Sequence, residues 1–144
     1  MTITLYENFR AVFYLPFYAT HALGAYEAEG VDVRLETSPS PEASATSLLN
    51  QDTDVSWGGP MRVLLTHDRL PDCGLVGFCE VVTKDPFFII GRDNPPDFDL
   101  RDLRDMRLGT VSEVPTPWLC LQDGLRRLDI DPDTLDRITD QSMA

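Results

Sequence analysis

Four loops of this sequence carry residues of the types that bind a small molecule. The first contains Asn8, Arg10 and Phe13. The planar guanidinium of Arg10 suits a carboxylate, sulfonate or phosphate group, and Phe13 would form an apolar wall beside it. The alternative is structural, with Phe13 in the core and Arg10 paired with a surface acid. The residues alone leave both interpretations open.

The next two loops follow the second and third predicted strands. Ser38 offers a hydroxyl to a polar ligand, although a serine that caps a helix would occupy the same position. Trp57 would supply a flat ring for stacking, and Gly58 and Gly59 would let the backbone approach a ligand closely. A tight turn beside a buried Trp57 is the alternative for this loop.

The fourth loop contains Ser112, Glu113, Thr116 and Trp118, and it leads into a predicted helix. The N–H groups at a helix start favour an anion, whereas the carboxylate of Glu113 repels an anion and attracts an amine. The sign of the ligand's charge therefore stays open. Glu80 is a further candidate, because a carboxylate buried at a strand end would accept a hydrogen bond from a ligand. A surface position is the alternative for Glu80.

Strand and helix patterns alternate along the chain, which predicts an α/β fold with a mainly parallel sheet. Ligands of such folds lie at the carboxyl ends of strands and the amino ends of helices, so the four loops should meet. Ser40 and Asp99 are predicted N-caps, and Gly30 should follow a helix end. The predicted strands are 2–6, 31–36, 54–57, 74–82, 87–91 and 107–111, and the predicted helices are 16–29, 41–50, 60–68, 100–105 and 116–128.

The composition is that of a globular chain with an unusual charge. The 144 residues include 24 Asp and Glu against 12 Lys and Arg, which gives a formal net charge of −12. Because nucleic-acid binding depends on clustered cations, we do not expect it here. No stretch reaches the length of a transmembrane helix, so membrane insertion is not expected either. The first residues also lack the pattern of a secretory leader.

The reactive side chains do not form a recognisable catalytic or metal-binding pattern. Cys73, Cys79 and Cys120 have neither a metal-ligand spacing nor an even number, and the last two are expected to be small buried residues. His21 and His67 are too isolated for a catalytic pair. We therefore expect no catalytic residue, no metal and no cofactor.

Four motifs, in order, resemble a known family. They are Gly-x-Tyr-x-x-Glu-Gly-Val-x-Val at 24–33, then 54–59, 98–103 and 107–111. Together they resemble the solute-binding proteins of nitrate, sulfonate and taurine ABC importers, whose domain also occurs in the thiamine-pyrimidine synthases. The resemblance covers almost the whole chain and implies a two-lobed, type II periplasmic-binding-protein fold. Lobe one would cover 1–84, and 85–144 would be the start of an incomplete second lobe.

This resemblance also implies a function. A small organic ligand, anionic or aromatic, would bind between the lobes for delivery to an ABC permease, with closure at a hinge near 83–86. The chain has about half the family's usual length, so it would be a fragment or have a partner that completes it. An open sheet edge would favour self-association. The family's location is periplasmic or extracytoplasmic, while the missing leader keeps a cytoplasmic location open.

Two other functions remain open: an enzyme of the same fold in pyrimidine or thiamine-precursor metabolism, and a cytoplasmic ligand-sensing module. In the resembling synthases, the position of Gly58 is a Lys that forms an imine with pyridoxal phosphate. The position of Arg62 is a His that is consumed as substrate. Neither residue is present here. Because the imine needs a primary amine, this difference argues against synthase chemistry.

Overall fold

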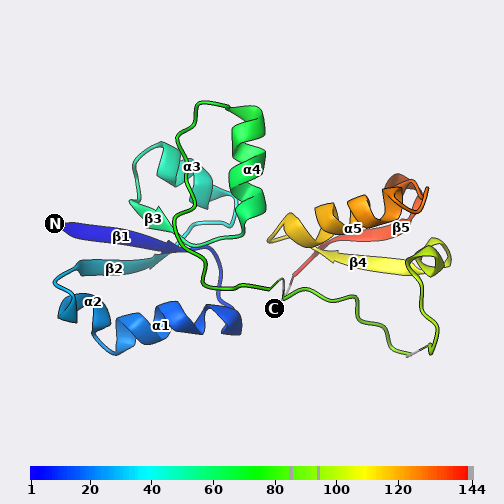
Figure 1. Ribbon diagram of the computed structural model, residues 1–144, viewed down its shortest axis with the longest axis horizontal. Helices are drawn as coiled ribbons and strands as arrows, with labels where there is room; N and C mark the ends of the chain where they lie inside the picture. The colour runs from blue at the N-terminus through cyan, green and yellow to red at the C-terminus, as the bar shows by residue number, and fades with distance from the viewer. Residues whose placement is uncertain (85, 94, 143–144) are drawn as a thin grey trace. The chain divides into compact units, whose positions relative to one another are not determined.

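The computed structural model describes residues 1–84, 86–93 and 95–142. The chain divides into two compact units, Met1–Pro86 and Phe87–Ala144, and each contains its own parallel sheet (Figure 1). Helices and parallel strands alternate in both units, so the predicted α/β class is confirmed. The predicted lobe boundary and hinge include Asp85, which lies outside the described residues.

The first unit is built on a three-stranded parallel sheet with the order β2-β1-β3. The central strand β1 (Thr2–Glu7) pairs in register along its whole length with β2 (Asp32–Thr37). The third strand, β3 (Val55–Ser56), is much shorter and pairs with Leu5 and Tyr6. All three strands run in the same direction, so their carboxyl ends meet at one edge of the sheet.

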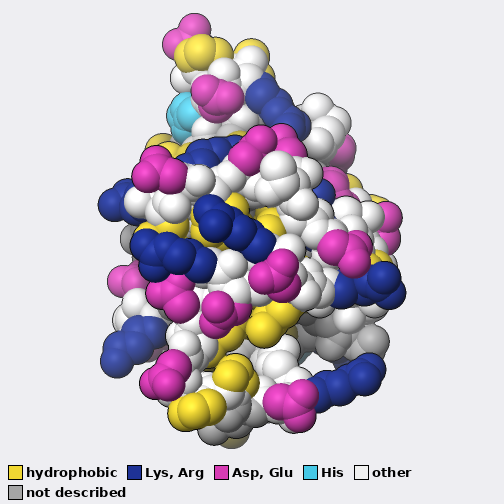
Figure 2. Space-filling model, turned by 90° about the vertical axis from the view of Figure 1, so that its right-hand side faces the viewer, with side chains coloured by type: hydrophobic (Ala, Val, Ile, Leu, Met, Phe, Trp, Pro, Cys, Tyr) yellow, Lys and Arg dark blue, Asp and Glu magenta, His cyan; other side chains and the backbone are white. Residues whose placement is uncertain are grey.

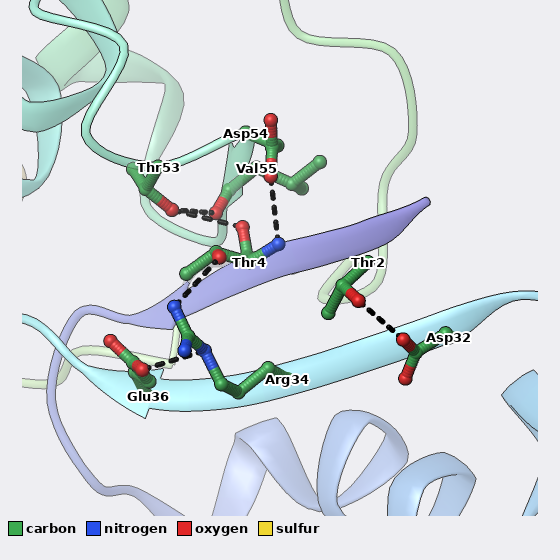
Figure 3. Close-up of polar contacts among 8 residues, drawn as sticks. All are labelled: Thr2, Thr4, Asp32, Arg34, Glu36, Thr53, Asp54 and Val55. Carbon is green, nitrogen blue, oxygen red and sulfur yellow. Dashed lines mark hydrogen bonds and ion pairs between the residues drawn. The ribbon is translucent and has the colours of Figure 1, made fainter.

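Side chains extend the pairing of β1 beyond the short β3 (Figure 3). The backbone N–H of Thr4 donates to the carboxylate of Asp54 at 2.8 Å. The hydroxyl of Thr53 donates to the carbonyl oxygen of Thr4 at 2.9 Å. These two contacts satisfy backbone groups that a longer β3 would otherwise pair. The other side of β1 carries the polar pairs of β2, including the ion pair of Arg34 with Glu36 at 2.8 Å.

Four helices surround this sheet in sequence: α1 (Leu15–Ala22), α2 (Ala25–Ala28), α3 (Ala43–Leu49) and α4 (Pro60–Arg69). A short 3-10 helix, Val12–Tyr14, precedes α1. The single helix predicted over 16–29 is divided at Gly24, whose φ of 67° lies in the left-handed region that ends an α-helix. Gly30 ends α2 as predicted, with a φ of 74°.

The core of the first unit lies between β1, β2 and the aromatic residues that follow them. The strands contribute the buried residues Leu5 and Val33. The 3-10 helix contributes Tyr14, and the loop after β3 contributes Trp57. Phe17 packs against this cluster from α1. The strand alternation of the sequence predicts the aliphatic part of this core, since residues two apart share a face.

The second unit contains a two-stranded parallel sheet and one α-helix. Strand β4 (Arg107–Val111) pairs with β5 (Asp136–Gln141), and α5 (Thr116–Arg126) connects them with a 3-10 turn, Pro132–Thr134. The predicted helix over 100–105 is a 3-10 helix, Leu100–Asp105, and the predicted N-cap Asp99 accepts a hydrogen bond from Arg101 N. Its core comprises Leu103, Leu125, Ile130 and Leu135. Strand β5 was not predicted from the sequence.

Two predicted strands are wrong. The residues of 74–82 and 87–91 form no strand, and Val76, Phe78, Phe88 and Ile90 are exposed. Apolar side chains favour a strand only where a neighbouring strand accepts the backbone hydrogen bonds. None of the described strands pairs with these segments.

Two predictions of burial are also wrong, and both concern cysteine residues. Cys79 and Cys120 were expected inside, but both are exposed. Cys79 belongs to the apolar run that forms no strand, so the burial expected of that strand does not arise.

Charged side chains of both signs lie on the surface of the protein. On the face drawn in Figure 2, acidic and basic side chains are interspersed with small apolar areas. In the part of the chain that the structure describes, none of the helices is both long enough and apolar enough to span a membrane.

Candidate functional site

The carboxyl edge of the first sheet brings together loop residues that the sequence analysis proposed. Asn8 follows β1, Ser38 follows β2, and Trp57 and Gly58 follow β3. Gly59 comes next and precedes α4. Because the strands are parallel and adjacent, residues distant in sequence become neighbours at this edge, which is the usual position of a ligand in such folds.

Some buried polar atoms of the first unit lack a hydrogen-bond partner. Among the described residues, the buried side-chain nitrogen and oxygen atoms without a hydrogen-bond partner are Glu7 Oε2, Asn8 Nδ2, Tyr18 Oη and Trp57 Nε1. Buried polar groups in folded proteins are nearly always hydrogen-bonded, so each of these exceptions calls for an explanation. One explanation is a ligand that supplies the missing partners.

The amide of Asn8 is fixed on one side and unpartnered on the other. Its side chain is 2% exposed, and its Oδ1 accepts a hydrogen bond from the hydroxyl of Ser44 at 2.9 Å. This bond orients Nδ2 toward Gly58, where an added Cβ atom would lie 3.8 Å from that nitrogen. Gly58 itself is exposed, so the space left by its missing side chain adjoins an N–H donor without a partner.

Trp57 contributes an N–H group to this edge while its ring belongs to the core. The ring stacks on Phe17 with a centroid distance of 4.2 Å and an interplanar angle of 23°. Tyr14 and Tyr18 contact it at centroid distances of 5.4 and 5.6 Å. These contacts correspond to the buried alternative stated for Trp57. The stacking partners of Trp57 are thus residues of the protein, and Nε1 is the part left without a partner.

Glu7 is a buried carboxylate that the sequence analysis missed. It is 2% exposed, and its Oε1 accepts hydrogen bonds from Thr37 Oγ1 at 2.8 Å and Arg10 Nε at 3.0 Å. Burial raises the pKa of Glu7, but the hydrogen bonds from Arg10 and Thr37 and the nearby hydroxyl of Tyr18 outweigh burial, so its pKa lies below the ordinary value. The carboxylate is therefore ionised at neutral pH.

Arg10 and Phe13 have structural roles in the first loop. Arg10 is paired through Nε with Glu7, while its side chain is 84% exposed. The ion pair raises the pKa of Arg10. Phe13 packs edge-on against Tyr14 at 4.6 Å and against Phe9 at 6.1 Å. The guanidinium thus lies at the surface beside the buried carboxylate, anchored at a single nitrogen.

A second arginine lies close to the aromatic cluster. Arg62 occupies the first turn of α4 and is half-buried. Burial lowers the pKa of Arg62, which the nearby Glu42 and Tyr14 partly offset. Tyr14 is itself buried, and this burial raises its pKa to about 12. Its phenol therefore remains protonated and uncharged at neutral pH.

The hydroxyl of Ser38 has a structural partner. It donates to the carbonyl oxygen of Ser40 at 2.7 Å, and Ser40 accepts from the N–H of Ala43 at 3.2 Å. The predicted N-cap at Ser40 is wrong, because α3 begins at Ala43 and Glu42 occupies the N-cap position. Both contacts stabilise the loop before α3, and Ser38 does not cap that helix as its structural alternative proposed.

The candidates of the fourth loop belong to the second unit. The carboxylate of Glu113 accepts from Ser142 Oγ at 2.9 Å and from Ser112 Oγ at 3.4 Å. Thr116 is the first residue of α5 and does not cap it with its side chain. The ring of Trp118 lies 4.1 Å from the guanidinium carbon of Arg137.

Glu80 belongs neither to the loop residues at the edge of the first sheet nor to those of the fourth loop. The strand that was expected to bury it does not form, and Glu80 is exposed. Within residues 1–84, 86–93 and 95–142, no group of three or more His, Cys, Asp or Glu side chains is arranged to hold a metal ion.

The buried Glu7 and its exposed partner Thr37 could have been found from strand alternation. Ile3, Leu5 and Glu7 occupy alternate positions of β1, so Glu7 shares the core-facing side of Leu5. Val33, Leu35 and Thr37 have the same relation in β2, and register places Thr37 opposite Glu7. An acidic residue at the end of an alternating apolar series is therefore the sequence pattern that would have indicated a buried carboxylate. Ser44 and Tyr18 lie on helices and carry no comparable signal.

Comparison with known proteins identifies the family. The model of the family described as "NMT1/THI5 like" matches residues 13–143, and the chain belongs to this family. This confirms the resemblance found in the sequence. The fold is accordingly α/β and similar to part of a periplasmic-binding-protein domain.

A curated relative comes from Bacillus subtilis (strain 168) and is named "Putative binding protein YtlA". It is 24% identical over 98 residues, which cover 68% of this chain and 29% of the relative. The match thus spans less than a third of the relative's length. Glu7, Asn8 and Arg10 precede the region that the family model matches.

Proposed function

We propose that this chain binds a small organic molecule at the carboxyl edge of the β2-β1-β3 sheet. The observation that carries the proposal is the pair of buried N–H donors without partners, Asn8 Nδ2 and Trp57 Nε1. A ligand with a hydrogen-bond acceptor would satisfy either donor.

Burying these two donors without partners lowers the stability of the protein. A buried donor without a partner costs roughly 1–3 kcal/mol of stability. Asn8 is held in this arrangement by Ser44, and Trp57 by the aromatic rings around it. Sites that hold unpaired polar groups in fixed positions are typical of ligand binding, because the ligand restores the lost hydrogen bonds.

The comparisons support a binding role at the level of the family. The Bacillus subtilis relative carries the name of a binding protein, and the family was expected from its resemblance to ABC solute-binding proteins. We extend the proposal to import: the chain would be part of an extracytoplasmic solute-binding protein that delivers its ligand to an ABC permease. The open edges of its short sheets would also favour self-association.

The exposed Arg10 would add an anion contact at the rim of the site. Its guanidinium is anchored to Glu7 through Nε and is otherwise largely exposed. Substituting Arg10→Ala should weaken the binding of an acidic ligand at least tenfold. An unchanged affinity for such a ligand would remove Arg10 from the site while leaving the two buried donors as its basis.

Native mass spectrometry of the protein as purified tests the proposal directly. A one-to-one mass excess of a few hundred daltons, lost in the Asn8→Leu variant, would support it. Leucine has a similar size and no N–H group, so the variant removes the donor with little change in volume. A bare chain that also binds nothing from a panel of amides, organic acids and heterocycles would contradict the proposal. The same spectra report whether the chain forms dimers.

A further inference from the structure

Glu7 adds an acceptor to a site otherwise defined by donors. Its Oε1 already accepts two hydrogen bonds, whereas Oε2 is buried and accepts none. A carboxylate has about four acceptor positions, so the unused oxygen retains its full capacity. The next residue in the chain is Asn8, whose Nδ2 is the unpartnered donor described above. Because neighbouring residues of a strand face opposite sides of the sheet, this acceptor and this donor lie on opposite sides of the strand end.

We propose that Glu7 determines specificity at this edge by accepting a hydrogen bond from the ligand, and that the site selects molecules carrying an N–H or O–H donor over anions that can only accept. This inference rests on the proposed function and specifies the chemistry of its ligand. A primary carboxamide is the simplest group that matches Glu7 Oε2, because its nitrogen donates hydrogen bonds and it carries no charge.

The charge of Glu7 acts against a purely accepting anion. The only cation paired with its carboxylate, within the described part of the chain, is Arg10. Arg10 is 84% exposed, so water screens much of its charge, whereas the carboxylate is buried and poorly screened. Thr37 contributes a hydroxyl bond and no charge. A carboxylate or nitrate ligand brought against Oε2 would meet a like charge and would leave that oxygen without a donor.

Tyr18 is the alternative partner inside the protein. Its hydroxyl also lacks a hydrogen bond of ordinary geometry, yet it lies near enough to Glu7 that each group shifts the pKa of the other, raising that of Tyr18 and lowering that of Glu7. Rotation of the phenol could supply the bond that Oε2 lacks. If that occurs, Oε2 is not available to a ligand, and Glu7 has no influence on selectivity.

Shape-matched ligand pairs separate these possibilities. We would measure by calorimetry the affinities of benzamide, benzoate, nicotinamide and nicotinate for the wild-type protein and for Glu7→Gln. Glutamine keeps an oxygen for Thr37 and Arg10 and removes the charge. Glu36→Gln is the matched control, because Glu36 is one residue from the end of β2, ion-paired with Arg34, and 39% exposed in its side chain. Both variants change the net charge equally.

The expected result is an amide preference that depends on Glu7. At least one amide should bind the wild-type protein tenfold or more tightly than its acid, and Glu7→Gln should reduce this ratio at least tenfold. Glu36→Gln should leave it within twofold. Equal or tighter binding of the acids to the wild-type protein would overturn the inference, and so would an amide preference that Glu7→Gln leaves unchanged.

The experiment also separates this inference from the proposed function. If only the acids bind, the proposed binding function stands and the proposed role of Glu7 is rejected. Binding of none of the four probes would reject both. If circular dichroism shows that Glu7→Gln does not fold, the ratio of amide affinity to acid affinity in the wild-type protein tests the inference.

Discussion

Substituting Gly58→Ala tests the site with a single methyl group. An added Cβ would lie 3.8 Å from Asn8 Nδ2, which is an ordinary van der Waals distance, and no other atom outside its chain neighbours lies within 4 Å. Gly58 is not among the glycines with a positive φ. The folded protein should therefore accept alanine without strain. The methyl group nevertheless occupies the side from which we expect a ligand to reach the amide nitrogen.

The structure gives opposite signs for stability and binding. Replacing glycine by alanine at an unstrained position stabilises a protein by about 0.4–1 kcal/mol, because the unfolded chain loses conformational freedom. A ligand acceptor must approach Nδ2 to about 2.9 Å, and an adjacent methyl group prevents that approach. Loss of one hydrogen bond that leaves a buried donor unpaired costs roughly 1–3 kcal/mol. The affinity should fall by about five- to 150-fold.

The assay is calorimetric titration with whichever compound the native mass spectra identify, combined with urea unfolding. Gly77→Ala is the matched control, since Gly77 is exposed, has no atom within 4 Å of an added Cβ and no positive φ. It should leave the affinity for the ligand unchanged. A Gly58→Ala protein that is as stable as the wild type and binds with unchanged affinity would refute the assigned direction of approach to Asn8.

Three further predictions concern titration and packing. The pKa of Glu7 is lowered on folding, so its stabilising contribution is present above the unfolded value of 4.5 and lost as the pH falls through the folded value. Urea unfolding from neutral to acid pH should show this loss, and Glu7→Gln should reduce it. Both ring nitrogens of His67 face carbonyl oxygens, of Pro71 at 3.2 Å and Leu75 at 2.8 Å, and these bonds raise its pKa above 6.5. Its contribution to stability is therefore complete below 6.5 and lost as the pH rises through the folded value; an NMR titration that gives a pKa of 6.5 or lower would contradict this. Leu125→Ala should destabilise the second unit by about 2–5 kcal/mol, because Leu125 is 0% exposed; a loss below about 1 kcal/mol by urea unfolding would show that the site collapses around the smaller side chain.

The sequence predicts the elements whose signals are local. The alternation of β1 and β2 and the proline residues that begin α4 and α5 define these elements to within about two residues. Strand β5 was missed, because Asp136–Gln141 is mostly polar and becomes a strand only by pairing with β4. The segments 74–82 and 87–91 show the converse, since strong apolar runs form no strand when none of the described strands pairs with them.

The site was predictable in position and less so in chemistry. Parallel strands place Asn8 and Trp57 at a common edge, which follows from the fold class alone. The side chain of each residue depends on neighbours distant in sequence. The hydrogen bond from Ser44 occupies Oδ1 of Asn8 and leaves Nδ2 without a partner. The ring of Phe17 stacks on Trp57 and holds it in the core. Glu7 was missed because an acid at a strand end was not compared with the apolar positions that precede it.

The central place of β1 affects the order in which the first unit can assemble. Strands β2 and β3 both pair with β1 and not with each other, across separations of 30 residues at Thr2–Asp32 and 50 residues at Leu5–Val55. Residues 2–7 must therefore remain unpaired during synthesis until β2 has emerged, and they gain their second neighbour only with β3. Pairings of such long range form slowly, because loop closure must precede the contacts. The same strand carries Glu7 and leads directly to Asn8, so the candidate site cannot exist before the last pairing of the sheet is complete.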